Sequence, residues 1–312
     1  MTLLKPKKLR PGDLIGLIAP AGPVLPHTRI QSAVNYLEKM GYRVALGRHV
    51  EEQYGYLAGE DSNRLADLND MLANTQVRMI MALRGGYGCM RLLEGINYRS
   101  LRRDPKIIVG FSDITALQLA FYRRTGLVSF AGPMAAVEFS DPPDPLTEEH
   151  FWKAVTTTHR LGLIPTPEPL TSLRPGRSEG TLLGGNLSLL ASLVGTRFLP
   201  KLKNAILMLE EVDERPYRID RMLTQLKLSG ALKDLKGLVI GQFTQCETND
   251  PTRPSLRCVE VLQDFTRAMD VPTLAGLCHG HVSRKVTLPW GVRARLETKT
   301  GRLEIMEAAL IS

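Results

Sequence analysis

The stretch IIVGFSDITALQLAF, residues 107–121, contains the transition that decides the fold. It begins as a short apolar run rich in β-branched residues and continues with the apolar spacing of a helix. Ser112 stands at the break, so the pattern predicts a strand, a sharp turn and a helix. A serine there is either a nucleophile exposed at the top of a sheet or a helix N-cap. Both readings stay open, because Ile114 replaces the second glycine of the GxSxG pattern and Asp113 would serve equally well as the cap.

The same alternation extends over the first half of the chain. Apolar strand patterns at 12–20, 42–46, 77–83, 106–110 and 127–132 alternate with helical patterns at 28–40, 61–73 and 112–124. Short continuous apolar strands separated by helices are typical of a parallel sheet covered on both faces. The first half is therefore expected to form an α/β domain.

The chain changes character after residue 160. Residues 160–178 are rich in proline and show little periodicity, which is typical of a linker. Strand patterns then follow at 179–185, 204–210, 237–243, 286–289, 292–297 and 302–306, with helical patterns near 186–195, 218–229 and 256–268. We predict an N-terminal domain over 1–165, a linker over 166–178 and a strand-rich α/β C-terminal domain over 179–312.

The composition excludes several classes of protein. The 312 residues are 43% apolar and 23% charged, as in an ordinary globular protein. The net charge is +8, but the basic residues are dispersed, so we expect no nucleic-acid partner. No apolar stretch approaches the roughly 20 residues of a membrane span, and the N-terminus lacks the apolar core of a signal peptide. The 4 cysteines have no metal-binding spacing and read as free thiols. Together these features predict a cytoplasmic protein that does not bind membranes.

Candidate chemistry gathers in segments that follow strands. In an open parallel sheet, functional groups lie at the carboxyl ends of the strands. A serine nucleophile needs a base, and the base needs an orienting carboxylate. His279 and His281 flank a glycine in a turn after an apolar run, where a solvent-reaching imidazole is expected. Glu210 directly ends the apolar strand AILML, so its side chain is expected at the mouth of the sheet.

The RGGYG segment, residues 84–88, follows a strand and begins a helix. Its paired glycines let backbone amides approach a ligand closely. The segment lacks the GxxxxGK[ST] pattern of a phosphate-binding loop, so an oxyanion-binding turn fits better, with a plain tight turn as the alternative. No third ligand accompanies His279 and His281 at a matching spacing, so no metal site is expected.

Six segments in this order make the chain resemble the LD-carboxypeptidase family of serine peptidases, which includes muramoyltetrapeptide carboxypeptidases and microcin C immunity proteins. The segments are RGGYG, GFSDIT, GPM (132–134), GGNLSLLASLVGT (184–196), LEEVDERPYRIDRML (209–223) and GHVSRKVTLPWG (280–291). The resemblance implies a flavodoxin-like N-terminal domain with a parallel sheet, a strand-rich C-terminal domain and commonly a homodimer. It places a Ser-Glu-His triad on Ser112, Glu210 and His281. It also implies an oxyanion hole made by the backbone amides of Gly86 and Asp113.

The implied reaction removes the terminal D-alanine from the L-centre of meso-diaminopimelate in muropeptide tetrapeptides. It proceeds through an acyl-enzyme on Ser112, needs no metal or organic cofactor, and belongs to peptidoglycan recycling. The free carboxylate of such a substrate calls for a cation, and Arg84 and Arg284 are the candidates. Gly85 and Tyr87 are further candidates for substrate binding.

Two alternative functions remain at this point. A microcin C immunity-type hydrolase would cleave aminoacyl or peptidyl nucleotide conjugates and would need a surface that stacks adenine. Trp152 and Trp290 are the 2 tryptophans, and Trp290 is close to the histidine motif. The alternative of another class is a non-catalytic protein that binds peptidoglycan peptides. The presence of all three triad residue types counts against it.

Overall fold

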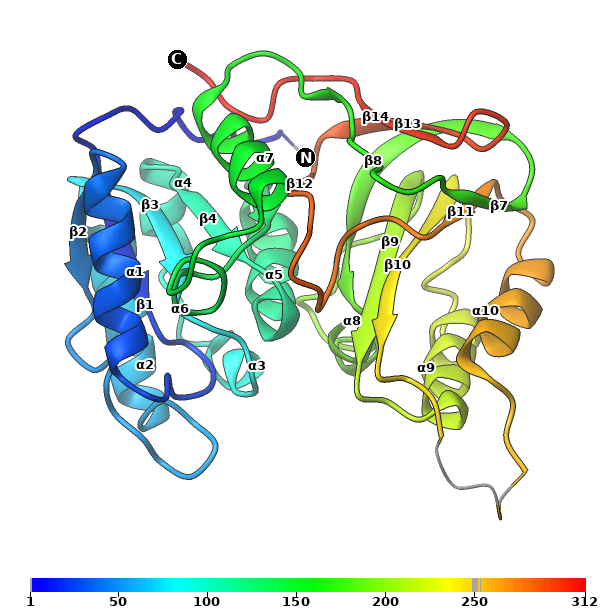
Figure 1. Ribbon diagram of the computed structural model, residues 1–312, viewed down its shortest axis with the longest axis horizontal. Helices are drawn as coiled ribbons and strands as arrows, with labels where there is room; N and C mark the ends of the chain where they lie inside the picture. The colour runs from blue at the N-terminus through cyan, green and yellow to red at the C-terminus, as the bar shows by residue number, and fades with distance from the viewer. Residues whose placement is uncertain (1, 249–251, 253) are drawn as a thin grey trace.

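The protein is built around two sheets that stand side by side, as the computed structural model shows for residues 2–248, 252 and 254–312 (Figure 1). The strand order is β12-β5-β4-β3-β1-β2 in the first sheet and β6-β14-β13-β8-β9-β10-β11-β7 in the second. Both sheets have a parallel centre and at least one antiparallel edge. The expected α/β fold class, with a flavodoxin-like first half and a strand-rich second half, is confirmed.

The first sheet runs 2-1-3-4-5 in its parallel part, which is the flavodoxin-like order. Its central strands are buried on both faces, and for this reason their sequences are continuous apolar runs rather than alternating ones. Its strands are β1 (Leu14–Ile18), β2 (Arg43–Leu46), β3 (Val77–Ala82), β4 (Ile107–Gly110), β5 (Ser129–Ala131) and the antiparallel β12 (Leu288–Trp290).

Helices surround the first sheet, and one of them lies between the two sheets. Helix α5 contacts both β8 and α8 of the second half, so it joins the two parts of the molecule (Figure 1). The helices of this half are α1 (Thr28–Lys39), α2 (Asp61–Ala73), α3 (Cys89–Leu92), α4 (Tyr98–Arg103), α5 (Thr115–Thr125), α6 (Ala135–Glu138) and α7 (Pro145–Thr156). The sequence patterns predicted α1, α2 and α5, and a helix beginning at the RGGYG segment, where α3 lies. They missed α4, α6 and α7.

The second sheet has parallel strands at its centre and antiparallel strands at both edges. Its strands are β6 (Gly162–Leu163), β7 (Thr171–Arg174), β8 (Arg177–Asn186), β9 (Ala205–Val212), β10 (Gly237–Thr244), β11 (Thr273–Ala275), β13 (Arg293–Glu297) and β14 (Arg302–Ile305). Its helices are α8 (Leu187–Ser192), α9 (Pro216–Leu228) and α10 (Cys258–Arg267).

Two segments differ from the sequence-based expectation. The proline-rich residues 166–178 contain β7, which pairs with β11 as an edge strand. The strand expected at 286–289 forms as β12, but in the first sheet, antiparallel to β5. The physical reason is the fully buried indole of Trp290, whose Nε1 donates to Oε1 of Gln118 on α5 at 3.2 Å. The chain therefore returns to the first half near its end, and the predicted division at 165 and 179 stays a prediction.

The two ends of the chain lie close together, with Lys7 and Ile311 forming a bridge between short extended segments. In the part of the chain that the structure describes, no helix is long and apolar enough to cross a membrane.

Candidate active site

Ser112 stands at the sharp turn between β4 and α5. A single turn of 3-10 helix, Ser112–Ile114, leads from the strand into the helix. The φ angle of Ser112 is 62°, in the left-handed region that a residue with a side chain rarely adopts. The residues at the N-caps of the 3-10 turn and of α5 make no side-chain cap bond. The Oγ atom of Ser112 instead lies 2.9 Å from Nε2 of His281.

Two adjacent carboxylates at the end of β9 point in opposite directions, as successive side chains of a strand do. Glu210 is fully buried, and its Oε2 lies 2.8 Å from Nδ1 of His281. Glu211 accepts hydrogen bonds from Nδ2 of Asn186 and from the amide and hydroxyl of Ser188 at the start of α8. Burial raises the pKa of Glu211. The strand thus gives one carboxylate to the histidine and one to a helix N-terminus.

His281 lies in the segment that crosses from β11 in the second sheet to β12 in the first. A carboxylate only accepts, so Nδ1–H of His281 donates to Glu210 and Nε2 is left to accept the Ser112 hydroxyl proton. That is the tautomer a general base requires. Ser112, His281 and Glu210 are therefore connected in a continuous hydrogen-bonded row.

His279 has a different environment two residues earlier. It is completely buried, with its Nδ1 2.7 Å from the carbonyl oxygen of Val286. Burial lowers the pKa of His279 to about 4, so its ring stays neutral near pH 7. Of the two histidines in the HGH turn, only His281 contacts Ser112 among the described hydrogen bonds.

The RGGYG turn passes directly beside the serine. A β-carbon at Gly85 would lie 2.9 Å from Oγ of Ser112, so this position has room only for glycine. The next residue, Gly86, has a φ of 121°, which also requires glycine. The carboxylate of Asp113, the residue after Ser112, accepts a hydrogen bond from the Cys89 amide at 2.8 Å. Burial raises the pKa of Asp113. The two backbone segments predicted to donate to an oxyanion thus meet at Ser112.

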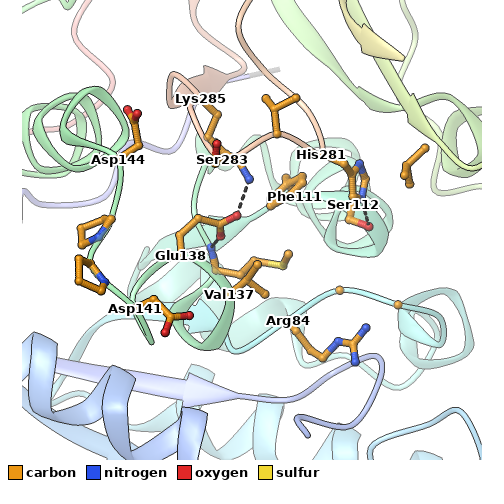
Figure 2. A pocket seen from close by; sticks show the side chains of 17 residues that line it. Arg84, Phe111, Ser112, Val137, Glu138, Asp141, Asp144, His281, Ser283 and Lys285 are labelled. Atoms are coloured by element: carbon orange, nitrogen blue, oxygen red, sulfur yellow. Dashed lines mark hydrogen bonds and ion pairs between the residues drawn. The ribbon is translucent and has the colours of Figure 1, made fainter. Parts of the chain in front are cut away.

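A cleft of about 680 Å³ opens beside the serine (Figure 2). Ser112 and His281 lie at one end of it, and acidic residues of the α6–α7 region lie at the other. Its walls are formed by Arg84, Gly85, Gly86, Phe111, Ser112, Met134, Val137, Glu138, Asp141, Pro142, Pro143, Asp144, Val212, His281, Val282, Ser283 and Lys285.

The charged side chains of the cleft are almost all paired. Its three acidic residues each bind a cation, in the pairs Glu138–Lys285, Asp141–Arg29 and Asp144–Arg284. Arg84 is the exception, because its Nη1 donates to the carbonyl of Pro23 at 2.9 Å and no carboxylate pairs with it in the described part of the chain. The cleft therefore presents one guanidinium whose charge is not neutralised.

The four predicted substrate-binding residues do not all reach the cleft. Arg84 and Gly85 line it. The ring of Tyr87 is 51% exposed and packs edge-on against Tyr56, and neither Tyr87 nor Arg284 is among the lining residues. The Nε of Arg284 instead donates to Asp144 at 3.2 Å.

Sequence reasoning missed Glu138 and Lys285, which lie in the cleft wall. Lys285 belongs to the histidine motif, so its position in the chain was a usable signal. Glu138 ends α6, a four-residue helix too short to show a periodic pattern.

Both halves of the chain match known family models. The model of the LD-carboxypeptidase N-terminal domain matches residues 15–132, and that of the LD-carboxypeptidase C-terminal domain matches residues 179–296. The probable murein peptide carboxypeptidase of Bacillus subtilis strain 168 is 40% identical over 98% of this chain and 97% of its own length.

Solved structures of two kinds resemble the fold. Muramoyltetrapeptide carboxypeptidase from Oxalobacter formigenes superposes with a TM-score of 0.83 and 33% identity, covering 96% of this chain and all of its own. The microcin immunity protein MccF, in complex with glutamyl sulfamoyl guanosine, superposes with a TM-score of 0.91 and 26% identity, over 99% of this chain and 100% of its own. Fold similarity alone therefore does not choose between the two substrate classes.

Proposed function

Because this chain belongs to the LD-carboxypeptidase family, we propose that it is a serine-type LD-carboxypeptidase that acts on muropeptide tetrapeptides. It removes the terminal D-alanine from the L-centre of meso-diaminopimelate. The observation that carries the proposal is the row of contacts from Ser112 through His281 to Glu210, at 2.9 and 2.8 Å.

Each residue of the triad has a role that follows from its contacts. The hydroxyl of Ser112 attacks the carbonyl carbon of the scissile amide while Nε2 of His281 takes its proton. The same imidazolium then gives that proton to the leaving amine of D-alanine, and an acyl-enzyme remains on Ser112. Glu210 keeps the imidazole in the required tautomer and stabilises its positive charge. Water, deprotonated by His281, hydrolyses the ester and restores the serine.

The oxyanion is assigned to the backbone amides of Gly86 and Asp113. The tight contact between Gly85 and the serine side chain supports this assignment, because it fixes the glycine turn beside the attacking oxygen. Backbone donors held in advance stabilise the charge that develops on the carbonyl oxygen, at about 3–4 kcal/mol for each donor.

Arg84 is the proposed partner of the terminal carboxylate of the substrate. It lines the cleft and has no carboxylate partner in the described chain, whereas Arg284 is not a lining residue and already pairs with Asp144. A guanidinium recognises a carboxylate through two parallel hydrogen bonds. A carboxypeptidase needs such a contact to distinguish the chain end from an internal peptide bond.

The aromatic side chains favour a muropeptide over a nucleotide conjugate. Trp290 is fully buried in β12, and the ring of Trp152 stacks on Tyr42 with centroids 5.0 Å apart. Neither tryptophan is among the cleft residues. Among the described residues that line the cleft, Phe111 is the one Phe, Tyr or Trp, and the ammonium of Lys285 lies over its ring. The cleft thus lacks a free aromatic surface on which adenine would stack.

A competition experiment tests the substrate class. The protein is given equimolar L-Ala-γ-D-Glu-meso-Dap-D-Ala and an aminoacyl sulfamoyl adenylate, and products are followed by mass spectrometry. We expect D-alanine to appear at least tenfold faster than the sulfamoyl nucleoside. Preferential cleavage of the adenylate would establish the microcin immunity-type activity instead, and binding of the tetrapeptide without cleavage would support the non-catalytic alternative.

The same assay examines the role of Arg84. The tetrapeptide amide, which lacks the terminal negative charge, is expected to be a poor substrate for the wild type. Arg84→Gln is expected to reduce turnover of the free acid and to leave turnover of the amide nearly unchanged. An equal loss on both substrates would remove Arg84 from carboxylate recognition.

We further propose that the protein is a cytoplasmic homodimer that needs no metal or organic cofactor.

A further inference from the structure

Lys285 is a buried cation next to the catalytic row. Its side chain is 2% exposed, and it forms a short ion pair with Glu138, whose side chain is 8% exposed. The second carboxylate oxygen of Glu138 accepts a hydrogen bond from the amide of Met134 at 2.7 Å. Replacing a buried ion pair by apolar residues is often neutral or stabilising, so stability alone does not account for a pair in this place. A role in positioning the catalytic residues explains the Lys285–Glu138 pair better.

The ammonium of Lys285 is aimed at the ring beside the nucleophile. Its Nζ lies 3.9 Å from the ring centroid of Phe111, the residue directly before Ser112. The Phe111 ring in turn meets the imidazole of His281 edge to face, with centroids 5.0 Å apart and planes inclined at 61°. Figure 2 shows Phe111 between Lys285 and His281, with the bond from Lys285 to Glu138 on the far side.

The backbone around Lys285 is hydrogen-bonded to helix α7. Its amide donates to Oγ1 of Thr147 on α7 at 2.8 Å, and that hydroxyl donates to the carbonyl of Ser283 at 3.0 Å. The segment that carries His281 is therefore held to the first half of the molecule by α6 and α7. The imidazole has to meet Ser112 from the first sheet and Glu210 from the second, so its position depends on this attachment.

We propose that Lys285 is a positioning residue for the catalytic histidine. Held by Glu138, its ammonium fixes the Phe111 ring, and the ring fixes the His281 imidazole in line with the serine hydroxyl. The inference rests on the proposed roles of Ser112 and His281. The Lys285–Glu138 pair therefore acts on the chemical step rather than on substrate binding.

The test removes both charges together, so that no unpaired charge stays buried. In Glu138→Gln/Lys285→Met, kcat for D-alanine release is expected to fall about 10- to 100-fold, the loss typical of a slightly misplaced catalytic group, with KM within about twofold. The matched control is Asp104→Asn/Lys106→Met, which removes a second buried lysine and its carboxylate partner. That variant is expected to keep the wild-type kcat.

A second variant tests the Phe111 ring alone, so that the test does not depend on whether the double variant folds. Phe111→Leu removes the ring but keeps the ion pair and an apolar, somewhat smaller, side chain, and it is expected to lower kcat as much as the charge-removing variant does. Combining Phe111→Leu with the charge-removing changes is expected to lower kcat no further, because the effects of substitutions along one series of contacts are not additive. Additive losses, or a folded Phe111→Leu with wild-type kcat, would overturn the inference.

The rate at which a fluorophosphonate modifies Ser112 separates this inference from the proposed substrate. Modification depends on the contact between Ser112 and His281 but on no particular peptide. Slower modification of the charge-removing variant than of the wild type supports the positioning role even if the tetrapeptide is not cleaved. Equal rates of modification contradict it, and so does a raised KM with unchanged kcat, which would make the pair a substrate contact.

Discussion

Ser112 shows at the scale of one residue what the sequence cannot reveal. Its φ of 62° costs about 1–3 kcal/mol for a residue with a side chain, and glycine would occupy the position without that cost. Glycine has no hydroxyl, so a serine there is explained by the use of its Oγ. Residue type and spacing could not separate this elbow from a helix cap, because both place a serine between a strand and a helix. The backbone angle and the His281 contact separate them.

The two buried histidines predict how stability depends on pH. Burial lowers the pKa values of His279 and His150 to about 4 each, below the ordinary 6.5. In the unfolded chain both rings bind protons at a higher pH than in the native protein. Stability is therefore complete above about pH 6.5 and falls as the pH drops toward 4, by up to about 3 kcal/mol for each ring.

Urea unfolding between pH 4 and 8 measures this loss, and NMR titration of the imidazole Cε1 protons assigns it. Both rings are expected to remain neutral down to about pH 5. The variants His150→Gln and His279→Gln identify the two signals. Titration of either ring near 6.5, or a free energy of unfolding that does not change between pH 6.5 and 4.5, would contradict the buried neutral state.

At the scale of elements, periodicity located the central strands and the long helices other than α7. Apolar runs predicted β1, β3, β4, β9 and β10 because these strands are buried on both faces. Helices α3 and α6 have only four residues each, which is too few for a periodic pattern. Helix α7 was missed although Asp144 caps it and a proline opens it, and both are signals of a helix start.

Side chains alternate between the two faces of β9, so the neighbouring residues Glu210 and Glu211 are predicted to have different roles. Glu210→Gln keeps the shape but removes the charge that faces His281, so kcat is expected to fall by about 10³- to 10⁴-fold with little change in melting temperature. Glu211→Gln disturbs a carboxylate that accepts bonds from Asn186 and Ser188, so it is expected to cost about 1–3 kcal/mol of stability.

Steady-state kinetics and thermal melts of the two variants measure both effects. Glu211→Gln is expected to retain most of kcat under conditions where it is folded. If the two substitutions lost activity equally at a temperature where both are folded, the separation of roles along β9 would be wrong.

At the scale of the whole molecule, the site exists only where the two halves meet. Ser112 comes from the first sheet, Glu210 from the second, and His281 from the segment between them. The order of the motifs and the family resemblance predicted this set, but no local pattern gave the contacts themselves. Gly185 is the small residue at the junction of the two halves. Next to it, the backbone amide of Asn186 on β8 donates to Oγ1 of Thr115 on α5 at 3.1 Å.

Gly185 is expected to control how closely the halves approach. A β-carbon there would lie 2.5 Å from Oγ1 of Thr115, so Gly185→Ala must push α5 away from β8. Because Ser112 lies in the turn directly before α5, a shift of the helix displaces the serine, and we expect kcat to fall about 10- to 100-fold. Gly195→Ala is the matched control, because Gly195 also has a positive φ but no neighbouring atom within 4 Å.

Kinetics with the tetrapeptide compare the two alanine variants. The control is expected to lose some stability through backbone strain and to keep wild-type kcat. Wild-type kcat in Gly185→Ala would show that the distance between α5 and β8 does not govern the site.

The role of Ser112 as the nucleophile is tested most directly by incubating L-Ala-γ-D-Glu-meso-Dap-D-Ala with the wild type and with Ser112→Ala. Mass spectrometry then measures the released D-alanine and the mass of the intact protein. We expect release by the wild type, a transient mass increase of one acyl group on the quenched wild-type protein, and neither signal from Ser112→Ala. Release by Ser112→Ala at a rate near that of the wild type would contradict this role, because the nucleophile would then lie elsewhere.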